Sequence, residues 1–431
     1  MARQLVGAMI ALALASSCGK RLNPAFCADN PDDGDCRDAG LVVIDAPPAA
    51  CARNEDCTAD PAAGVCDTGL GACVQCIPGV EETACTGLTP NCGEDRLCKG
   101  CVVDTNCPLS NVCLPNGQCA DEANVLYAAP AATGNCTKTA PCTLAMAVAS
   151  VTAAKYIIKM TTTSGQAYSE PPLALSTAQP LQILGTGTTF QPSQGGDAIA
   201  VTAGNVEIVG VTIRDATGNN ANGVSCAGGA RLTLRKMSIV GSNAFGVSSN
   251  GCNLLVERCR ISGNPSGGLN LSAGDMEIRN NIIDKNGTNA LTEGNVRIRN
   301  ATGRFVFNTV ANNNSENGGG GRVSGVACTH SAAGTFLVAR NIIAGNGGAN
   351  ASTNGDCTYA GNHISGTVAG VGFVSENDLH LTAMTPATNP IIRDDPDADA
   401  DCKVNGKYID DYDGQPRPVG FCDRGADEYR P

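Results

Sequence analysis

Apolar and polar residues alternate in short runs through the middle of the chain, and these runs recur every 22 to 33 residues. The repeat can be anchored on six aliphatic positions: Ile213, Ile239, Ile261, Ile283, Val310 and Ile343. The residues five positions earlier are apolar as well: Ile208, Leu234, Val256, Ile278, Phe305 and Val338. Alternation with a period of two predicts β-strands. Because one such strand cannot bury its inner face and stacked copies can, the repeat predicts a solenoid.

Asparagine recurs at two fixed distances from the anchors. Two positions before three of them stand Asn281, Asn308 and Asn341, and three positions after four of them stand Asn264, Asn286, Asn313 and Asn346. Equivalent residues of stacked coils lie about 4.8 Å apart. Each side-chain amide can then bond to the next, which lets asparagine recur at buried turns. Eight positions after three anchors, the repeat has the further apolar residues Val247, Leu269 and Leu291.

This pattern resembles the right-handed parallel β-helix of the pectin-lyase-like superfamily. The coils VFNTVANN (306–313) and ARNIIAGN (339–346) carry the resemblance. Residues 125–151 resemble the usual entry, in which a strand and a cysteine-bearing loop lead to a short helix. The resemblance implies an all-β solenoid over residues 123–375 with a short N-terminal capping helix. Such a helix covers a sheet edge that would otherwise template aggregation.

The end of the chain carries a second resemblance. Residues 411–429, DYDGQPRPVGFCDRGADEY, resemble the C-terminal region of choice-of-anchor Q proteins, which have a hydrophobic residue where Arg424 stands. The resemblance implies a C-terminal cap over residues 376–431. An aspartate run before it could hold calcium through Asp397, Asp399 and Asp401. The run lacks the glycine and distal glutamate of an EF-hand loop, and a solvated acidic loop is the alternative.

Most of the 24 cysteines lie before the solenoid. Three four-cysteine units, at 51–73, 76–98 and 101–119, begin 25 residues apart and predict three small modules over residues 51–122. The units contain too few apolar residues to form cores, so we expect disulfides to stabilise them. Zinc is the alternative at the two Cys-x2-Cys pairs. The spacing does not reveal the pairing. Residues 19–50, rich in Asp, Pro and Ala, predict a flexible tether.

The β-helix fold also suggests partners for the later cysteines. Cys226 and Cys252 each lie 13 residues after an anchor, so they would occupy one position of neighbouring coils, within disulfide range. Local pairs are expected at the entry, in a long loop and in the C-terminal cap: Cys136 with Cys142, Cys328 with Cys357, and Cys402 with Cys422. Cys259 stands at an inward position and is predicted to be a buried free thiol.

The N-terminus predicts export. Residues 1–18 contain Arg3 and an apolar core at 5–15 that is too short to span a bilayer. Ala15-Ser16-Ser17-Cys18 resembles a bacterial lipobox, although leucine usually stands where Ala15 does. The resemblance implies that Cys18 is lipidated, and Gly19 after it implies the outer membrane or cell surface of a Gram-negative bacterium. Plain secretion, with Cys18 in a disulfide, is the alternative.

Charge suggests one binding surface. The net charge of −12 argues against nucleic acid as a partner, but residues 123–375 carry a net charge of +5. Outward positions of adjacent strands hold five basic residues: Arg235, Lys236, Arg258, Arg260 and Arg279. Such a stripe could hold the acidic groups of a polysaccharide. The alternative is a solvated strand face in which Glu257 pairs with the arginines.

No catalytic constellation is evident. Glycoside hydrolysis needs two carboxylates facing each other, and the strand glutamates fall at different positions or in separate coils. His330, His363 and His380 lie in late loops and are expected to be solvated. The sequence therefore predicts no catalytic residue and no cofactor beyond the calcium candidates. It favours an anchored surface protein that adheres, binds a ligand (an acidic polysaccharide or a surface protein) or serves as structure. A polysaccharide lyase or hydrolase is the alternative, on fold analogy and the basic stripe.

Overall fold

The chain forms two compact units in the computed structural model, Met1–Ala120 and Asp121–Pro431. The structure describes residues 51–57, 64–78, 84–85, 89, 91–161, 165–287, 294–313, 323–330, 336–347, 349–351, 356–382, 400–404, 407–420 and 422–429. The predicted signal sequence with its lipidation site at Cys18 and the predicted tether at 19–50 lie outside these residues. So do two of the three predicted calcium ligands, Asp397 and Asp399.

The first unit contains three small modules held by disulfides. Every module joins its first cysteine to its third and its second to its fourth: Cys51–Cys66, Cys57–Cys73, Cys76–Cys92, Cys85–Cys98, Cys101–Cys113 and Cys107–Cys119. All cysteines of the Cys-x2-Cys pairs are thereby oxidised. The elements in its described residues are the strands β1 (Val65–Asp67), β2 (Ala72–Val74), β3 (Asn91–Cys92) and β4 (Cys98–Lys99) and the 3-10 helices η2 (Asn54–Cys57) and η4 (Asp104–Asn106).

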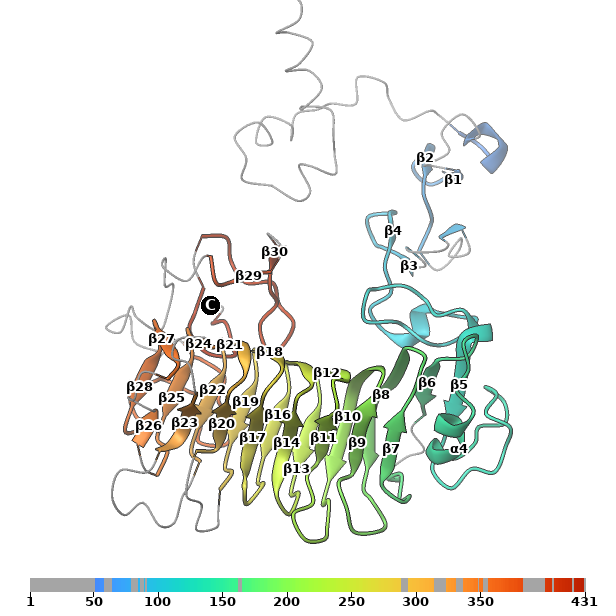
Figure 1. The fold of residues 1–431 in the computed structure, drawn as a ribbon. Helices are drawn as coiled ribbons and strands as arrows, with labels where there is room; N and C mark the ends of the chain where they lie inside the picture. The colour runs from blue at the N-terminus through green and yellow to red at the C-terminus, as the bar shows by residue number, and fades with distance from the viewer. Residues whose placement is uncertain are drawn as a thin grey trace, which may run out of the picture. The chain divides into compact units, whose positions relative to one another are not determined.

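The second unit is a parallel β-solenoid of about seven turns (Figure 1). Its larger sheet has two arms that meet in the long strand β10 (Asn205–Arg214), whose first half pairs with β12 and whose second half pairs with β13. One arm contains β12 (Arg231–Arg235), β15 (Asn253–Glu257), β18 (Asp275–Arg279), β21 (Thr302–Val306), β24 (Phe336–Ala339) and β27 (Thr358–Ala360). The other contains β13 (Ser238–Val240), β16 (Arg260–Ser262), β19 (Ile282–Asp284), β22 (Thr309–Ala311), β25 (Ile342–Ala344) and β28 (His363–Ser365).

A separate eight-stranded sheet forms the remaining side of each coil. In spatial order it consists of β26 (Ala349–Ala351), β23 (Val323–Thr329), β20 (Val296–Arg299), β17 (Gly267–Ser272), β14 (Phe245–Asn250), β11 (Val224–Ala227), β9 (Ile199–Ala203) and β7 (Leu173–Ser176). All of its pairings are parallel, as in the larger sheet. Each coil thus contributes one strand to each arm and one to this sheet.

The register agrees with the repeat at the anchors and departs from it after them. Anchor pairs such as Ile213 with Ile239 and Ile283 with Val310 are directly opposite. In the eight-stranded sheet Leu269 pairs with Val296, which stands five residues after the repeat position at Leu291; Leu291 itself lies outside the described residues.

Two asparagine ladders run inside the turns. The first contains Asn281, Asn308, Asn341 and Asn362, and the second Asn264, Asn286, Asn313, Asn346 and Asn350. At each step the side-chain amide and the backbone N–H of one residue donate to Oδ1 of the next, as the spacing predicts. Apolar side chains of all three strand sets fill the space between the ladders and form one continuous core.

The entry of the solenoid holds the 3-10 helix η5 (Glu122–Asn124), the strands β5 (Val125–Ala128), β6 (Ile157–Met160) and β8 (Leu181–Phe190), and the only described α-helix, α4 (Leu144–Ala149). Thr143 caps α4 by accepting from the amide of Met146 at 3.1 Å. The buried carboxylate of Glu170 accepts from the amides of Leu144 and Ala145 at 2.9 and 2.8 Å, which places a negative charge at the positive end of the helix.

The end of the chain packs on the outer side of the larger sheet (Figure 1). Two short strands, β29 (Lys403–Val404) and β30 (Lys407–Tyr408), pair with each other. Residues 407–429, here called the C-terminal segment, continue across coils that contain Asn280 and Phe307. Arg417 fixes this contact: Nη2 donates to Asn280 Oδ1 at 3.0 Å and Nη1 to Glu428 at 2.7 Å, while its guanidinium lies 4.6 Å from the Phe307 ring centroid.

Candidate functional site

The five basic residues predicted to bind an anionic ligand, the basic stripe, lie on the side of the larger sheet that carries the C-terminal segment. They are Arg235, Lys236, Arg258, Arg260 and Arg279. The register puts Arg235, Glu257 and Arg279 at one position of adjacent coils. Lys236 and Arg258 follow them with left-handed backbone, at φ of 52° and 57°. This conformation turns the chain from one arm of the larger sheet into the other.

Glutamates separate the arginines of the stripe. Arg235 Nε donates to Glu207 Oε1 at 3.0 Å and its Nη1 contacts Glu257. Arg279 Nε donates to Glu257 Oε1 at 2.7 Å, and Nη1 lies 3.3 Å from Glu277. Glu257 is 7 % exposed, so salt screens these pairs less than it screens a surface pair. The structure therefore contains the Glu257 ion pair that was the alternative to a free basic stripe.

Two further arginines hold the protein's own groups. Arg258 Nε donates to the carbonyl oxygen of Tyr412 at 3.0 Å, and its Nη1 lies 3.6 Å from Asp410. Arg260 binds the fully buried Asp284 through two parallel hydrogen bonds of 3.2 and 2.9 Å. Burial lowers the pKa of Arg258, while the acidic C-terminal segment counteracts part of that effect. Arg258 thus helps to dock the C-terminal segment, and Arg260 helps to fix β19.

A pocket of about 370 Å³ remains between the stripe and the C-terminal segment. Its lining consists of Thr212, Lys236, Met237, Ser238, Arg258, Arg260, Tyr412 and Asp413. Burial and then the charge of Arg258 lower the pKa of Lys236. A negative group entering the pocket would oppose both effects, because it would pair with the ammonium. Three cationic side chains and one carboxylate, that of Asp413, line the pocket, so its net charge favours one acidic group of a ligand.

A histidine lies among carboxylates beside this pocket. His380 Nδ1 contacts Asp378 Oδ1, and its Nε2 lies 3.4 Å from Asp413 Oδ1. The Tyr412 ring meets the imidazole edge-on at 5.7 Å. Burial opposes the charge on His380, but Asp378, Asp427 and Asp413 outweigh burial and raise its pKa. Burial also raises the pKa of Asp427 to about 6.

The expectation that His380 is a solvated residue without an acidic partner is wrong. One signal was visible in the sequence, since Asp378 stands two residues before it. The other partners are 33 and 47 residues further along, where no local pattern connects them to the histidine. Of the other two histidines, His330 Nε2 lies 2.9 Å from the carbonyl oxygen of Ala301. His363 is half-buried in β28 and not in a loop, so the expectation for it is also wrong.

The acidic run before the C-terminal segment enters the described structure at Asp401. Its Oδ2 accepts from Arg340 Nε at 2.9 Å. This predicted calcium ligand therefore holds an arginine of the solenoid, and the ion pair ties the end of the acidic run to the turn after β24. The remaining candidates, Asp397 and Asp399, lie outside the described residues.

The structure joins the later cysteines in four disulfides: Cys136–Cys142, Cys226–Cys252, Cys328–Cys357 and Cys402–Cys422. The reason given for the second pair is wrong, because Cys226 is directly opposite Ser249 in the next coil. The chain between the anchor and the eight-stranded sheet is three residues shorter in that coil, and the bond instead spans the turn that follows. Cys259 is free and fully buried.

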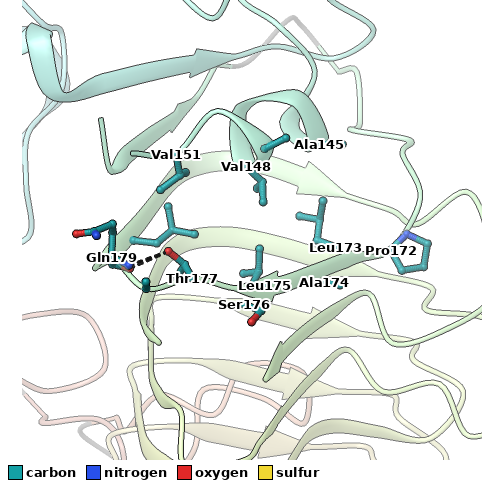
Figure 2. Close-up of a pocket in the computed structure, with 13 residues that line it drawn as sticks. Ala145, Val148, Val151, Pro172, Leu173, Ala174, Leu175, Ser176, Thr177 and Gln179 are labelled. Atoms are coloured by element: carbon teal, nitrogen blue, oxygen red, sulfur yellow. Dashed lines mark hydrogen bonds between the residues drawn. The ribbon is translucent and has the colours of Figure 1, made fainter. Parts of the chain in front are cut away.

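A second hollow, of about 610 Å³, lies between α4 and the edge strand β7 (Figure 2). Val148 and Val151 face Leu173 and Leu175 across it, and Thr177 bonds to the carbonyl oxygen of Gln179 at its end. None of its described lining residues is ionisable. This groove can accommodate apolar groups but offers no acid, base or metal ligand for a reaction.

Comparison with known proteins bears on the fold. A family model described as "Right handed beta helix region" matches residues 197–368. A crystal structure of pectate lyase Pel9A aligns with 14 % sequence identity and a TM-score of 0.40, over 71 % of this chain and 96 % of that one. No curated protein matches. No helix in the described part of the chain is long and apolar enough to cross a membrane. The matched coils form a right-handed parallel β-helix.

Proposed function

We propose that this chain is an exported surface protein, anchored through a lipid on Cys18, whose β-helix presents a non-catalytic binding site for an acidic glycan. Disulfides in every described module and in four places of the solenoid unit support an oxidising compartment. The lipobox-like residues before Cys18 support the anchor and the outer membrane or cell surface.

The proposed binding role rests on which groups the residues of the basic stripe already contact. Glu207, Glu257 and Glu277 engage its arginines, and the C-terminal segment covers Arg258. An enzyme needs an acid or base within reach of its substrate, whereas these carboxylates already hold guanidinium groups. The Lys236 pocket is the part of this face that remains open. It suits the binding of one acidic group better than it suits catalysis.

Binding and turnover can be tested in one experiment. Full-length protein in detergent would be mixed with a panel of acidic polysaccharides, with and without calcium, and both bound glycan and new chain ends would be measured. We expect salt-sensitive binding without products. Lys236→Gln should weaken binding, while Lys155→Gln, with the same charge change at the entry of the solenoid, should not. Product formation would establish the alternative, a polysaccharide lyase or hydrolase. A chain that binds no glycan in the panel would point to a structural role.

The anchor needs its own test. Cys18→Ala should move the protein from the membrane fraction to the medium or periplasm, and mass spectrometry of the wild-type N-terminus should find an acylated cysteine. An unmodified N-terminus, with unchanged fractionation of the variant, would contradict the anchor.

A further inference from the structure

The histidine cluster beside the Lys236 pocket has the composition of a metal site. His380, Asp413 and Asp427 each offer one ligand atom, and these atoms all lie within 4.8 Å of one another. They come from two stretches of chain, the loop at 378–382 and the C-terminal segment. Ligands of one ion at about 2.0–2.2 Å from it lie roughly 3 to 3.5 Å apart, which the 3.4 Å between His380 Nε2 and Asp413 Oδ1 matches.

The orientation of the imidazole follows from its partner on the other side. Asp378 Oδ1 contacts Nδ1 and also accepts from the backbone amide of His380 at 3.2 Å. A proton held on Nδ1 leaves the lone pair on Nε2. Nε2 is buried and makes no hydrogen bond. A carboxylate that orients a histidine in this way is typical of metal-ligating imidazoles.

The carboxylates facing Nε2 are acceptors, so they cannot satisfy its lone pair when the nitrogen carries no proton. Asp427 is 6 % exposed, and its Oδ2 accepts from the amide of Leu381 at 2.7 Å, which fixes it against the same loop. Two carboxylates and a nitrogen lone pair converge here, and no donor among the described residues bonds to Nε2. Three cations nearby bind other groups: Arg258 the carbonyl oxygen of Tyr412, Arg260 the carboxylate of Asp284, and Lys285 the side chain of Asn377. A bound cation would satisfy all three groups together.

We propose that His380 Nε2, Asp413 and Asp427 bind one divalent transition-metal ion of the zinc class, with Asp378 orienting the imidazole. One imidazole with two carboxylates suits such an ion better than calcium, which prefers oxygen ligands alone. The ion fastens the loop at 378–382 to the C-terminal segment. Asp413 also lines the Lys236 pocket, but metal binding does not depend on a glycan at Lys236.

The test uses full-length protein under non-reducing conditions, stripped with a chelator and titrated with zinc by calorimetry at neutral pH. We expect one equivalent to bind and to raise the melting temperature. His380→Gln and Asp413→Asn should each weaken binding at least tenfold, and Asp378→Asn by about 10- to 100-fold. His363→Gln, at a histidine in β28, should bind as the wild type does.

Cobalt gives an independent readout, because its visible spectrum reports a nitrogen ligand that His380→Gln would remove. Asp413 is 45 % exposed in its side chain, so Asp413→Asn should fold and keeps the test interpretable. Zinc that fails to bind, or that binds equally to the wild type, His380→Gln and Asp413→Asn, would overturn the proposal. In either case a proton on Nε2 would be the cation that the cluster holds.

Discussion

Asn281 Nδ2 donates to Asn308 Oδ1 in the next coil at 2.9 Å, and the backbone amide of Asn281 donates to the same oxygen at 3.0 Å. Both residues are fully buried. The Asn308 side chain therefore accepts from a backbone donor and from a side-chain amide donor of Asn281. Asn308 in turn donates to Asn341 in the same two ways. The ladder makes each coil depend on the next through polar contacts as well as through the apolar core.

Breaking the ladder in its middle should be costly. Asn308→Leu removes the acceptor for two buried donors of Asn281 and the donor to the carbonyl oxygen of Ile278. Each group left unsatisfied costs about 1–3 kcal/mol, so we expect the free energy of unfolding to fall by at least about 3 kcal/mol in denaturant titrations. Asn219→Ala, in an exposed loop, should change it by less than about 0.5 kcal/mol. Equal midpoints for the two variants would contradict the role of the ladder.

Cys259 occupies the step before Asn281 and makes the same contacts. Its backbone amide donates to Asn281 Oδ1 at 2.8 Å, its sulfur lies 3.4 Å from the amide of Met237, and its thiol is directed to Leu234 O. Burial raises the pKa of this thiol to about 12. We therefore predict that alkylating reagents label Cys259 only after unfolding, as read from peptide masses.

The same geometry predicts that Cys259→Asn is tolerated. Asparagine is close to cysteine in volume and would extend the ladder by one step, replacing two weak sulfur contacts with amide hydrogen bonds. We expect the free energy of unfolding to stay level or to rise by about 1 kcal/mol. Cys259→Leu, which overfills this fully buried site and bonds to neither neighbour, should lower it. A loss of stability in Cys259→Asn as large as in Cys259→Leu would contradict this account.

The repeat in the sequence predicted these inner positions because it reflects a local physical requirement. Alternation marks the inward strand residues, and asparagine marks the turns where a ladder replaces solvent. Loop length was not constrained in this way, which is why the expected register of Cys226 opposite Cys252 was wrong. A surface loop can lengthen at little entropic cost without changing the core.

The candidate site was harder to predict because it joins distant parts of the chain. Arg417 and Asn280 are 137 residues apart, and Arg258 and Tyr412 are 154 apart. No periodicity connects such pairs. The basic stripe could be read from strand alternation, but the C-terminal segment that covers it could not. Only Asp378, two residues from His380, gave a local sign of the histidine cluster.

Glu257 should matter more for stability than its neighbour Glu277. It lies between Arg235 and Arg279 and is 7 % exposed, and removing one member of a buried ion pair costs about 3–5 kcal/mol when burial is complete. Because Arg235 is partly solvated, we expect Glu257→Gln to lower the free energy of unfolding by about 2 kcal/mol. Glu277→Gln, at a side chain that is 28 % exposed, should cost less. A larger loss of unfolding free energy in Glu277→Gln than in Glu257→Gln would contradict this prediction.

Gly414 should be required for docking of the C-terminal segment. Its φ is +88°, and a Cβ there would meet the guanidinium of Arg258. Gly420 has a φ of +92° with open space around it. Both alanine variants bear the backbone strain of about 1–3 kcal/mol, so a difference between them isolates the Arg258 contact. We predict faster hydrogen exchange across residues 407–429 in Gly414→Ala than in Gly420→Ala. Equal exchange rates in the two variants would mean that the close approach of Gly414 to Arg258 is not needed for docking of the C-terminal segment.

The first two modules are linked by a charge contact that acid should release. Arg96 Nε donates to Asp67 Oδ2, and the amides of Gly69 and Leu70 donate to Oδ1 at 2.9 and 3.2 Å. The hydrogen bond from Arg96 is the main reason that the pKa of Asp67 is lowered. A lowered folded-state pKa means that the contact stabilises fully above the usual value of about 3.9, and is lost as the pH falls through the folded-state pKa.

Carboxyl carbon chemical shifts of Asp67, followed by NMR between pH 2 and pH 6 (a range of about two units on each side of the usual pKa), would test this contact. Arg96→Gln should move the midpoint of Asp67 upward, toward the ordinary value. Arg53→Gln is the matched control, because Arg53 faces Glu55 and Asp56 within the first module. An Asp67 midpoint that is unchanged in Arg96→Gln would show that the two backbone amides alone hold this carboxylate. The contact between the two modules would then not depend on the ion pair, and acid would not separate them.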